Sequence, residues 1–139
     1  MIVLDENIHE AQRLRLVSSR VGPRQIGVDF GPKGLKDEQI IVRLRGRKGI
    51  TFFTRDAGFY FAGLRHPAYC LVVLNVAQND VATFVRRFLK HPDFQTNSAR
   101  MGRVVRVSHI GLAYYRRNSQ AEFHAVWKPT TVRADRDQS

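Results

Sequence analysis

Three aspartates stand where their side chains could act together. Asp5 and Asp56 follow apolar segments that predict β-strands, and Asp37 opens a helical pattern that follows another strand. If those strands are parallel, their carboxyl ends share one edge of the sheet, which is where α/β sheets bind ligands. Three carboxylates at such close range repel one another unless a cation lies between them. Carboxylate oxygens suit Mg²⁺ or Mn²⁺, so the pattern predicts a metal site, with Glu38 as a spare ligand or a water-positioning base.

The chemistry expected of such a site is hydrolysis of a phosphodiester bond. A divalent metal there orients a water molecule, lowers its pKa and neutralises charge on the phosphate. The chain has 23 Lys and Arg residues against 12 acids, for a formal net charge of +11. Such an excess favours polyanions, and nucleic acid first among them. Together these features predict a metal-dependent nuclease that uses Asp5, Asp37, Asp56 and Glu38 in catalysis.

Basic residues near the aspartates are the expected contacts to nucleic acid. They are Arg43, Arg45, Arg47, Lys48 and Arg55. For Arg55, contact with a phosphate and bracing of Asp56 are equally compatible with the sequence. The aspartates also have an ordinary structural interpretation, because Asp is a common helix-capping residue. Asp5 and Asp37 could cap helices, and Asp56 could cap the next short helix or pair with Arg55.

Strand and helix patterns alternate through the first two thirds of the chain, which predicts an α/β fold with a parallel sheet. We expect the strand order 2-1-3-4, which places the first and third strands side by side. The expected strands are residues 1–4, 25–29, 50–54 and 69–76. The expected helices are residues 6–19, a second from Asp37 to before Gly46, a short one at 57–64, and one from about Asp80 to Lys90.

The last third has a different pattern. Residues 103–108 suggest one more strand, and residues 110–117 and 121–128 alternate like the two arms of an antiparallel hairpin. We expect one domain over residues 1–128, with an α/β core at 1–94, a β extension at 103–128 and a polar tail at 129–139. The hairpin should complete the sheet or form a homodimer contact, because an exposed edge strand invites pairing.

The composition bounds the class of protein. A chain of 139 residues fits one domain, and no apolar run approaches the roughly 18 residues of a membrane span. The start, MIVLDEN, lacks the basic and long apolar regions of a secretory signal. A single cysteine excludes an internal disulfide framework. We therefore expect a cytoplasmic protein without a membrane partner.

The segments LDENI, GLKDEQI, TFFTRDAGF and YCLVVLNV resemble the PIN-like nuclease fold. The likeness is to its short PIN-like branch, often found beside toxin–antitoxin genes, and extends to VapC-like toxin ribonucleases. It covers residues 1–94, and the order of the segments and the 19-residue step from Asp37 to Asp56 carry it. The resemblance implies a three-layer fold, Asp5, Asp37 and Asp56 as metal ligands, RNA in preference to DNA as the substrate, and an antitoxin protein as a partner.

Two departures from the family pattern keep an alternative open. The chain has no room for a further acid that the full-length ribonucleases carry between the first and third positions. Ala57 and Gly58 stand where many relatives have a second acid. The alternative is a non-catalytic PIN-like module that binds nucleic acid or a partner protein. A receiver-type signalling domain is disfavoured, because no lysine occurs between Lys48 and Lys90.

Overall fold

A seven-stranded sheet runs through the molecule. The computed structural model describes residues 1–127 of the chain. The strand order is β2-β1-β3-β4-β5-β6-β7; the first five strands are parallel, and β6 and β7 are antiparallel to their neighbours. The strands are β1 (Ile2–Leu4), β2 (Arg24–Gln25), β3 (Ile50–Thr54), β4 (Tyr69–Leu74), β5 (Val104–Ser108), β6 (Gly111–Tyr115) and β7 (Glu122–Ala125).

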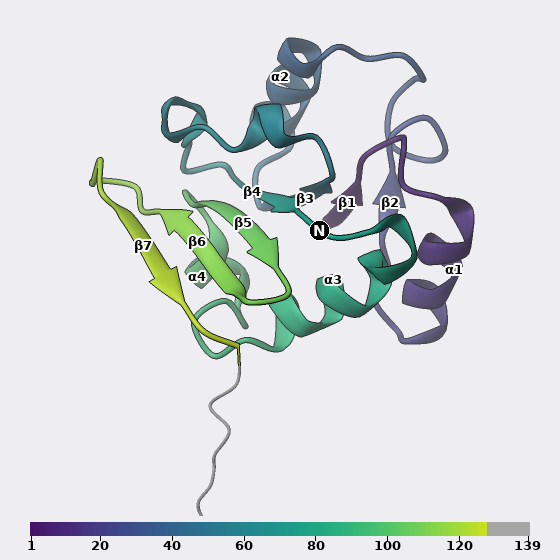
Figure 1. The fold of residues 1–139 in the computed structure, drawn as a ribbon. Coiled ribbons are helices and arrows are strands. Elements are labelled where there is room, and N and C mark those ends of the chain that lie inside the picture. The colour runs from purple at the N-terminus through teal and green to yellow at the C-terminus, as the bar shows by residue number, and fades with distance from the viewer. Residues whose placement is uncertain (128–139) are drawn as a thin grey trace, which may run out of the picture.

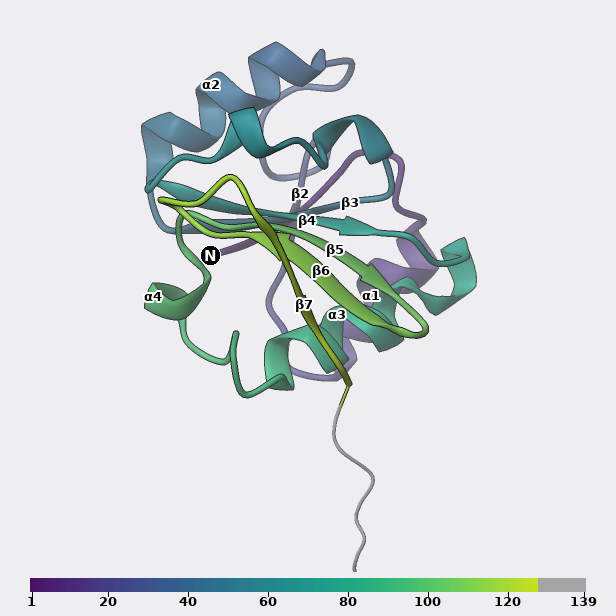
Figure 2. The ribbon, with the colours of Figure 1, turned by 60° about the vertical axis from the view of Figure 1, so that its left-hand side comes forward.

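Helices cover both faces of the sheet, which gives three layers (Figures 1 and 2). One face carries α2, and α1, α3 and α4 lie on the other side. The α-helices are α1 (Glu10–Ser18), α2 (Asp37–Arg47), α3 (Val81–Lys90) and α4 (Asn97–Arg100), and short 3₁₀ turns are η1 (Ala57–Phe59), η2 (Ala62–Leu64) and η3 (Gln78–Asp80). None of the helices in residues 1–127 has the length and apolar character needed to cross a membrane.

The central strand β3 is buried over its whole length, and its apolar side chains pack on both faces of the sheet. Phe52 packs in the cluster that holds Leu44 of α2. Phe53 points to the other face, where its ring centroid lies 5.7 Å from that of Phe88 on α3. Burial of each such side chain contributes on the order of 2 kcal/mol to stability. The two layers therefore fix β3, and with it the position of the residues that follow it.

The expected parallel core is confirmed. The order 2-1-3-4 is present, and β1 and β3 are neighbours with Leu4 opposite Phe53. The segment at 103–108 is a fifth parallel strand, β5. Of the two roles considered for the hairpin, completion of the sheet is confirmed, since β6 pairs with β5 and β7 with β6. Lys128 and the tail at 129–139 lie outside the described residues.

The first helix differs from the expectation. It begins at Glu10 rather than at residue 6, and its apolar residues Leu14 and Val17 are 50% and 51% exposed. The buried positions of the helix are Gln12 and Leu16. Gln12 occupies a core position because its Oε1 accepts a hydrogen bond of 2.9 Å from the N–H of Ala82. A pattern read from apolar residues alone could not place this polar side chain inside.

Other boundaries also differ. Helix α2 continues through Gly46 to Arg47. The segment 57–64 forms the two 3₁₀ turns η1 and η2 instead of one helix. Strand β2 is only two residues long, because Asp29 Oδ1 accepts from the N–H of Gln25 at 2.7 Å and Gly27, at φ +83°, turns the chain away. Strand β4 ends at Leu74 rather than at residue 76.

Gln25 fixes the loop between β1 and α1. Its side chain is buried, and its Nε2 donates to the carbonyl of Asp5 at 2.9 Å and to that of Ile8 at 2.7 Å. These bonds satisfy carbonyl groups that a helix starting at residue 6 would have used internally. The loop therefore turns at the end of β1, and Asp5 is held in a defined orientation.

We predict that Gln25→Leu lowers the free energy of unfolding by about 1–3 kcal/mol, because the carbonyl of Ile8 loses its partner and the carbonyl of Asp5 keeps only the N–H of Ile8. Urea unfolding monitored by circular dichroism measures the change. Gln95→Leu is the matched control, since the exposed Gln95 amide donates only to the carbonyl of Lys90. Equal losses in the two variants would contradict a special role for Gln25.

Candidate active site

Asp5 is the buried member of the three aspartates. It follows β1, and only 9% of its surface is exposed. Its Oδ1 accepts from the N–H of Glu6 at 2.7 Å, and its Oδ2 accepts from the hydroxyl of Thr54 at 2.6 Å. Burial raises the pKa of the Asp5 carboxyl; the two hydrogen bonds oppose this, and the charges of Asp56 and Glu6 add to it. The hydrogen bond from Thr54 therefore holds the Asp5 carboxylate against β3, the neighbouring strand.

Thr54 joins the carboxyl ends of β1 and β3. Besides donating to Asp5, its Oγ1 accepts a 3.0 Å hydrogen bond from the N–H of Asp56. Asp56 in turn accepts from the N–H of Gly58 through Oδ1 at 2.8 Å, so it caps η1 as one of the alternatives predicted. The cap uses one carboxylate oxygen and leaves Oδ2 for another partner. Sequence reasoning missed Thr54, although a buried threonine at the end of a strand signals a hydrogen-bonding role.

Asp37 faces the same region from the start of α2. A Cβ built on Gly58 would lie 3.1 Å from Asp56 Oδ1 and 3.8 Å from Asp37 Oδ2, so the two carboxylates flank this glycine. Partial burial raises the pKa of the Asp37 carboxyl, and the charges of Asp56, Asp5 and Glu38 raise it further. Asp37 does not cap its helix, because the N-cap residue is Lys36. The capping alternative is therefore wrong for Asp37.

The reason for this convergence is the chain path. Strands β1 and β3 end at the same edge, and α2, which runs back along the sheet, begins there. Helix α1 leads from β1 to β2 on one face, and α2 leads from β2 to β3 on the other, so the winding reverses between β1 and β3. Such a switch point is the place where open α/β sheets commonly bind ligands. Within residues 1–127, no three His, Cys, Asp or Glu side chains are grouped closely enough to hold a metal ion.

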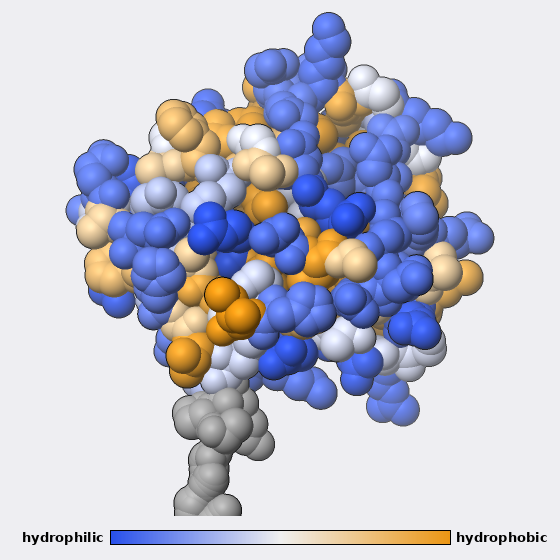
Figure 3. Space-filling model, viewed as in Figure 1, coloured by the Kyte–Doolittle hydropathy of each residue, from blue (hydrophilic) through white to orange (hydrophobic). Residues whose placement is uncertain are grey.

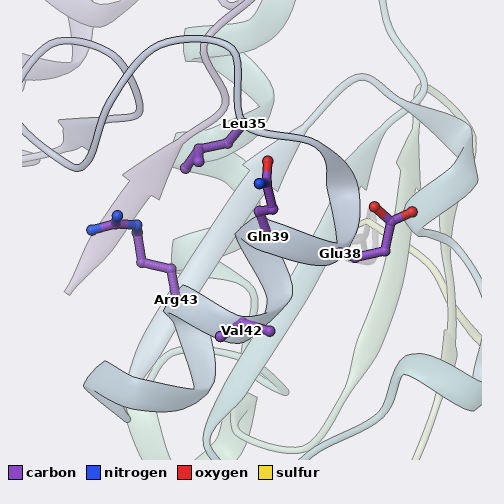
Figure 4. A pocket seen from close by; sticks show the side chains of 5 residues that line it. All are labelled: Leu35, Glu38, Gln39, Val42 and Arg43. Carbon is purple, nitrogen blue, oxygen red and sulfur yellow. The ribbon is translucent and has the colours of Figure 1, made fainter.

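Glu38 follows Asp37 in the first turn of α2. It lines a shallow hollow of about 470 Å³ with Leu35, Gln39, Val42 and Arg43. In Figure 4 the Glu38 carboxylate and the Arg43 guanidinium point to opposite sides of this hollow. The charge of Glu38 contributes to the raised pKa of Asp37, so the two residues interact electrostatically.

The basic residues expected to contact nucleic acid do not surround the aspartates. Arg55 Nε donates to the carbonyl of Val76 at 2.9 Å instead of bracing Asp56. Arg43, Arg45, Arg47 and Lys48 follow along or just beyond α2, so the last of them lie at the other end of the helix from Asp37, about 15 Å away at 1.5 Å per residue. The Arg47 guanidinium lies 5.6 Å from the ring centroid of Phe30.

Comparison of the chain with protein-family models, with curated proteins and with solved structures finds no match.

The raised pKa values give the site a pH-dependent effect on stability. The folded protein holds the protons of Asp5 and Asp37 to higher pH than the unfolded chain does. Between the unfolded value of about 4 and the raised folded values, the unfolded chain is the more ionised state. The free energy of unfolding contributed by these groups therefore falls as pH rises through that window.

We predict that Asp56→Asn makes this fall smaller and raises the melting temperature at neutral pH, because the change removes a charge that repels both Asp5 and Asp37. Urea unfolding in EDTA from pH 4 to neutrality measures it, with Asp93→Asn as a control at an exposed acid after α3. The same pH dependence in both variants and in the wild type would show that the carboxylates do not interact.

Proposed function

We propose that the chain is a metal-dependent nuclease of PIN-like fold, which cleaves phosphodiester bonds with Mg²⁺ or Mn²⁺ held by Asp5, Asp37 and Asp56. The observation that carries the proposal is that all three carboxylates lie at the switch point of a parallel sheet, where the charge of Asp56 helps to raise the pKa of both Asp5 and Asp37. Hard oxygen ligands at one edge of the sheet fit these two cations better than a zinc or iron centre.

The burial and hydrogen bonds of each acidic residue suggest its role in catalysis. Asp5 is held by two hydrogen bonds and would fix the position of the cation. Asp37 and Asp56 are exposed, so they would face both the cation and the substrate. Glu38 would accept a proton from, or orient, the attacking water. A bound divalent cation would supply the neutralisation of phosphate charge that this acidic edge lacks.

The substrate class follows from charge and from the resemblance. A formal charge of +11 favours nucleic acid, and hydrophilic side chains dominate the face drawn in Figure 3. The likeness to toxin ribonucleases favours RNA over DNA, a cytoplasmic site of action and an antitoxin protein as a partner. A homodimer through the hairpin is part of the same proposal.

A second candidate is a non-catalytic module that binds nucleic acid or a partner. It is favoured by Ala57 and Gly58, which stand in place of a further acid, and by the absence of a closed group of metal-binding side chains among residues 1–127. The two candidates share the nucleic-acid-binding surface and differ in cleavage.

We predict that Asp56→Asn abolishes Mn²⁺-dependent cleavage of single-stranded RNA, with a loss of at least about 100-fold in rate. Asn keeps an oxygen ligand but no charge, so the site loses much of its hold on a divalent cation. The measurement is a time course with labelled RNA, purified wild type and both Asp56→Asn and Asp93→Asn, each with Mn²⁺ or with EDTA.

Cleavage by Asp56→Asn at the wild-type rate would remove the catalytic assignment. A wild type that binds RNA but does not cleave it under any of these conditions would establish the non-catalytic candidate instead.

A further inference from the structure

A second polar hollow lies at the amino edge of the sheet, opposite the aspartates. It has a volume of about 410 Å³, within the range of ligand-binding pockets. It lies between α4 and the turn that joins β6 to β7, and Figure 2 shows these two segments at the same end of the sheet. Its polar lining includes Arg103, Arg116, Arg117, Ser98, Asn118 and Ser119.

The turn that carries two of these arginines is held in place by a residue distant in sequence. Arg65 Nη1 donates to the carbonyl of Arg116 at 2.7 Å and also bonds the carbonyl of Ser119. A third contact, of 3.4 Å, reaches the carbonyl of Arg117. The turn 116–119 is thereby tied to η2, so the arginine side chains project from a fixed backbone.

Aromatic rings support two of the three guanidinium groups. Arg103 lies over Phe94 and Tyr114, at 5.4 Å and 5.5 Å from the ring centroids. Arg116 lies 4.2 Å from the ring centroid of Phe123. A guanidinium stacked on a ring keeps its N–H groups at the rim, where they are able to form bidentate hydrogen bonds. The arrangement restricts the side chains before any ligand binds.

No carboxylate neutralises these arginines within the described part of the chain. The ion pairs there are Arg13–Glu10, His109–Asp80 and His124–Glu122, and none involves the hollow. Three positive charges held close together without a counter-charge favour an anionic ligand with several negative charges. The small polar side chains of Ser98, Asn118 and Ser119 add hydrogen-bond donors to the same hollow.

We propose that this arginine hollow, defined by Arg103, Arg116 and Arg117, binds the phosphodiester backbone of a single-stranded nucleic acid. Guanidinium groups form bidentate hydrogen bonds with phosphate oxygens. The formal net charge of +11 favours a polyanion such as nucleic acid as the ligand. This proposal rests on the proposed function, and it assigns substrate binding to the edge of the sheet away from the carboxylates.

The distance between the two edges of the sheet sets the length of nucleic acid that can contact both. Five residues of β3 span roughly 17 Å. A single-stranded nucleic acid that contacts both the hollow and the aspartates must therefore extend over several nucleotides. The acidic edge would repel the backbone in the absence of a cation, whereas the arginine hollow binds without one.

The test measures binding without cleavage, in EDTA, by fluorescence anisotropy with oligouridylate and oligothymidylate probes. The triple variant R103Q/R116Q/R117Q is compared with R15Q/R20Q/R24Q. This control makes an equal change of charge at exposed residues on α1 and near β2, the edge strand farthest from β7 in the strand order. We expect the triple variant to bind both probes at least about tenfold more weakly at low salt. The slope of log affinity against log salt should fall by about 2, because each lost phosphate contact removes about 0.7.

Equal affinities of the two triple variants would overturn the proposal, as would a loss confined to the RNA probe, which would assign the contact to the 2′-hydroxyl. If R103Q unfolds the protein through loss of its ring contacts, R116Q/R117Q tests the same hollow with two exposed residues and an expected slope change of about 1.4. Because the readout is binding in EDTA, its failure is distinct from failure of metal-dependent cleavage.

Discussion

The hydrogen bonds of Thr54 are the interaction on which the candidate site depends. One hydroxyl donates to the buried carboxylate of Asp5 and accepts from the backbone of Asp56, so it joins the ends of two parallel strands. Burial of both phenylalanines on β3 fixes the strand that carries Thr54. Together these contacts hold carboxylates close enough to affect one another's protonation, which isolated surface acids would avoid. An arrangement that costs stability in this way is typical of a functional site.

Charge is distributed unevenly between the two edges of the sheet. The carboxyl edge holds the acids that follow β1 and β3 and begin α2, whereas the amino edge holds basic residues from α2 and from the β6–β7 turn. The reason lies in direction: a helix that starts beside the end of one strand must finish beside the start of the next. The basic residues at the end of α2 and the arginine hollow thus share an edge, and both can attract a polyanion without being next to the aspartates.

Much of the core was predictable because its elements bury two faces. The segment ITFFT matches β3 residue for residue, and the strand order follows from the alternation of strands and helices. The neighbouring positions of Asp5 and Asp56 follow from that order. The buried face of α1 could not be predicted, because Gln12 is buried through a hydrogen bond from Ala82, a contact 70 residues away that no local pattern reveals.

The positions of some arginines were predictable from the sequence, and those of others were not. That Arg47 lies far from Asp37 follows from helix length, and the sequence contained the information. The arginine hollow could not be predicted, because it depends on how Arg65 ties the turn 116–119 to η2 and on rings from three separate segments. These contacts are set by packing between residues distant in the chain.

The most direct test of the central claim is an anomalous difference map from a crystal soaked in Mn²⁺. The account predicts a peak among the carboxylates of Asp5, Asp37 and Asp56, with oxygen distances of about 2.0–2.3 Å, and its loss in Asp56→Asn. A map from well-diffracting crystals with no peak among the three aspartates at saturating Mn²⁺, or with a peak only elsewhere on the surface, would contradict it.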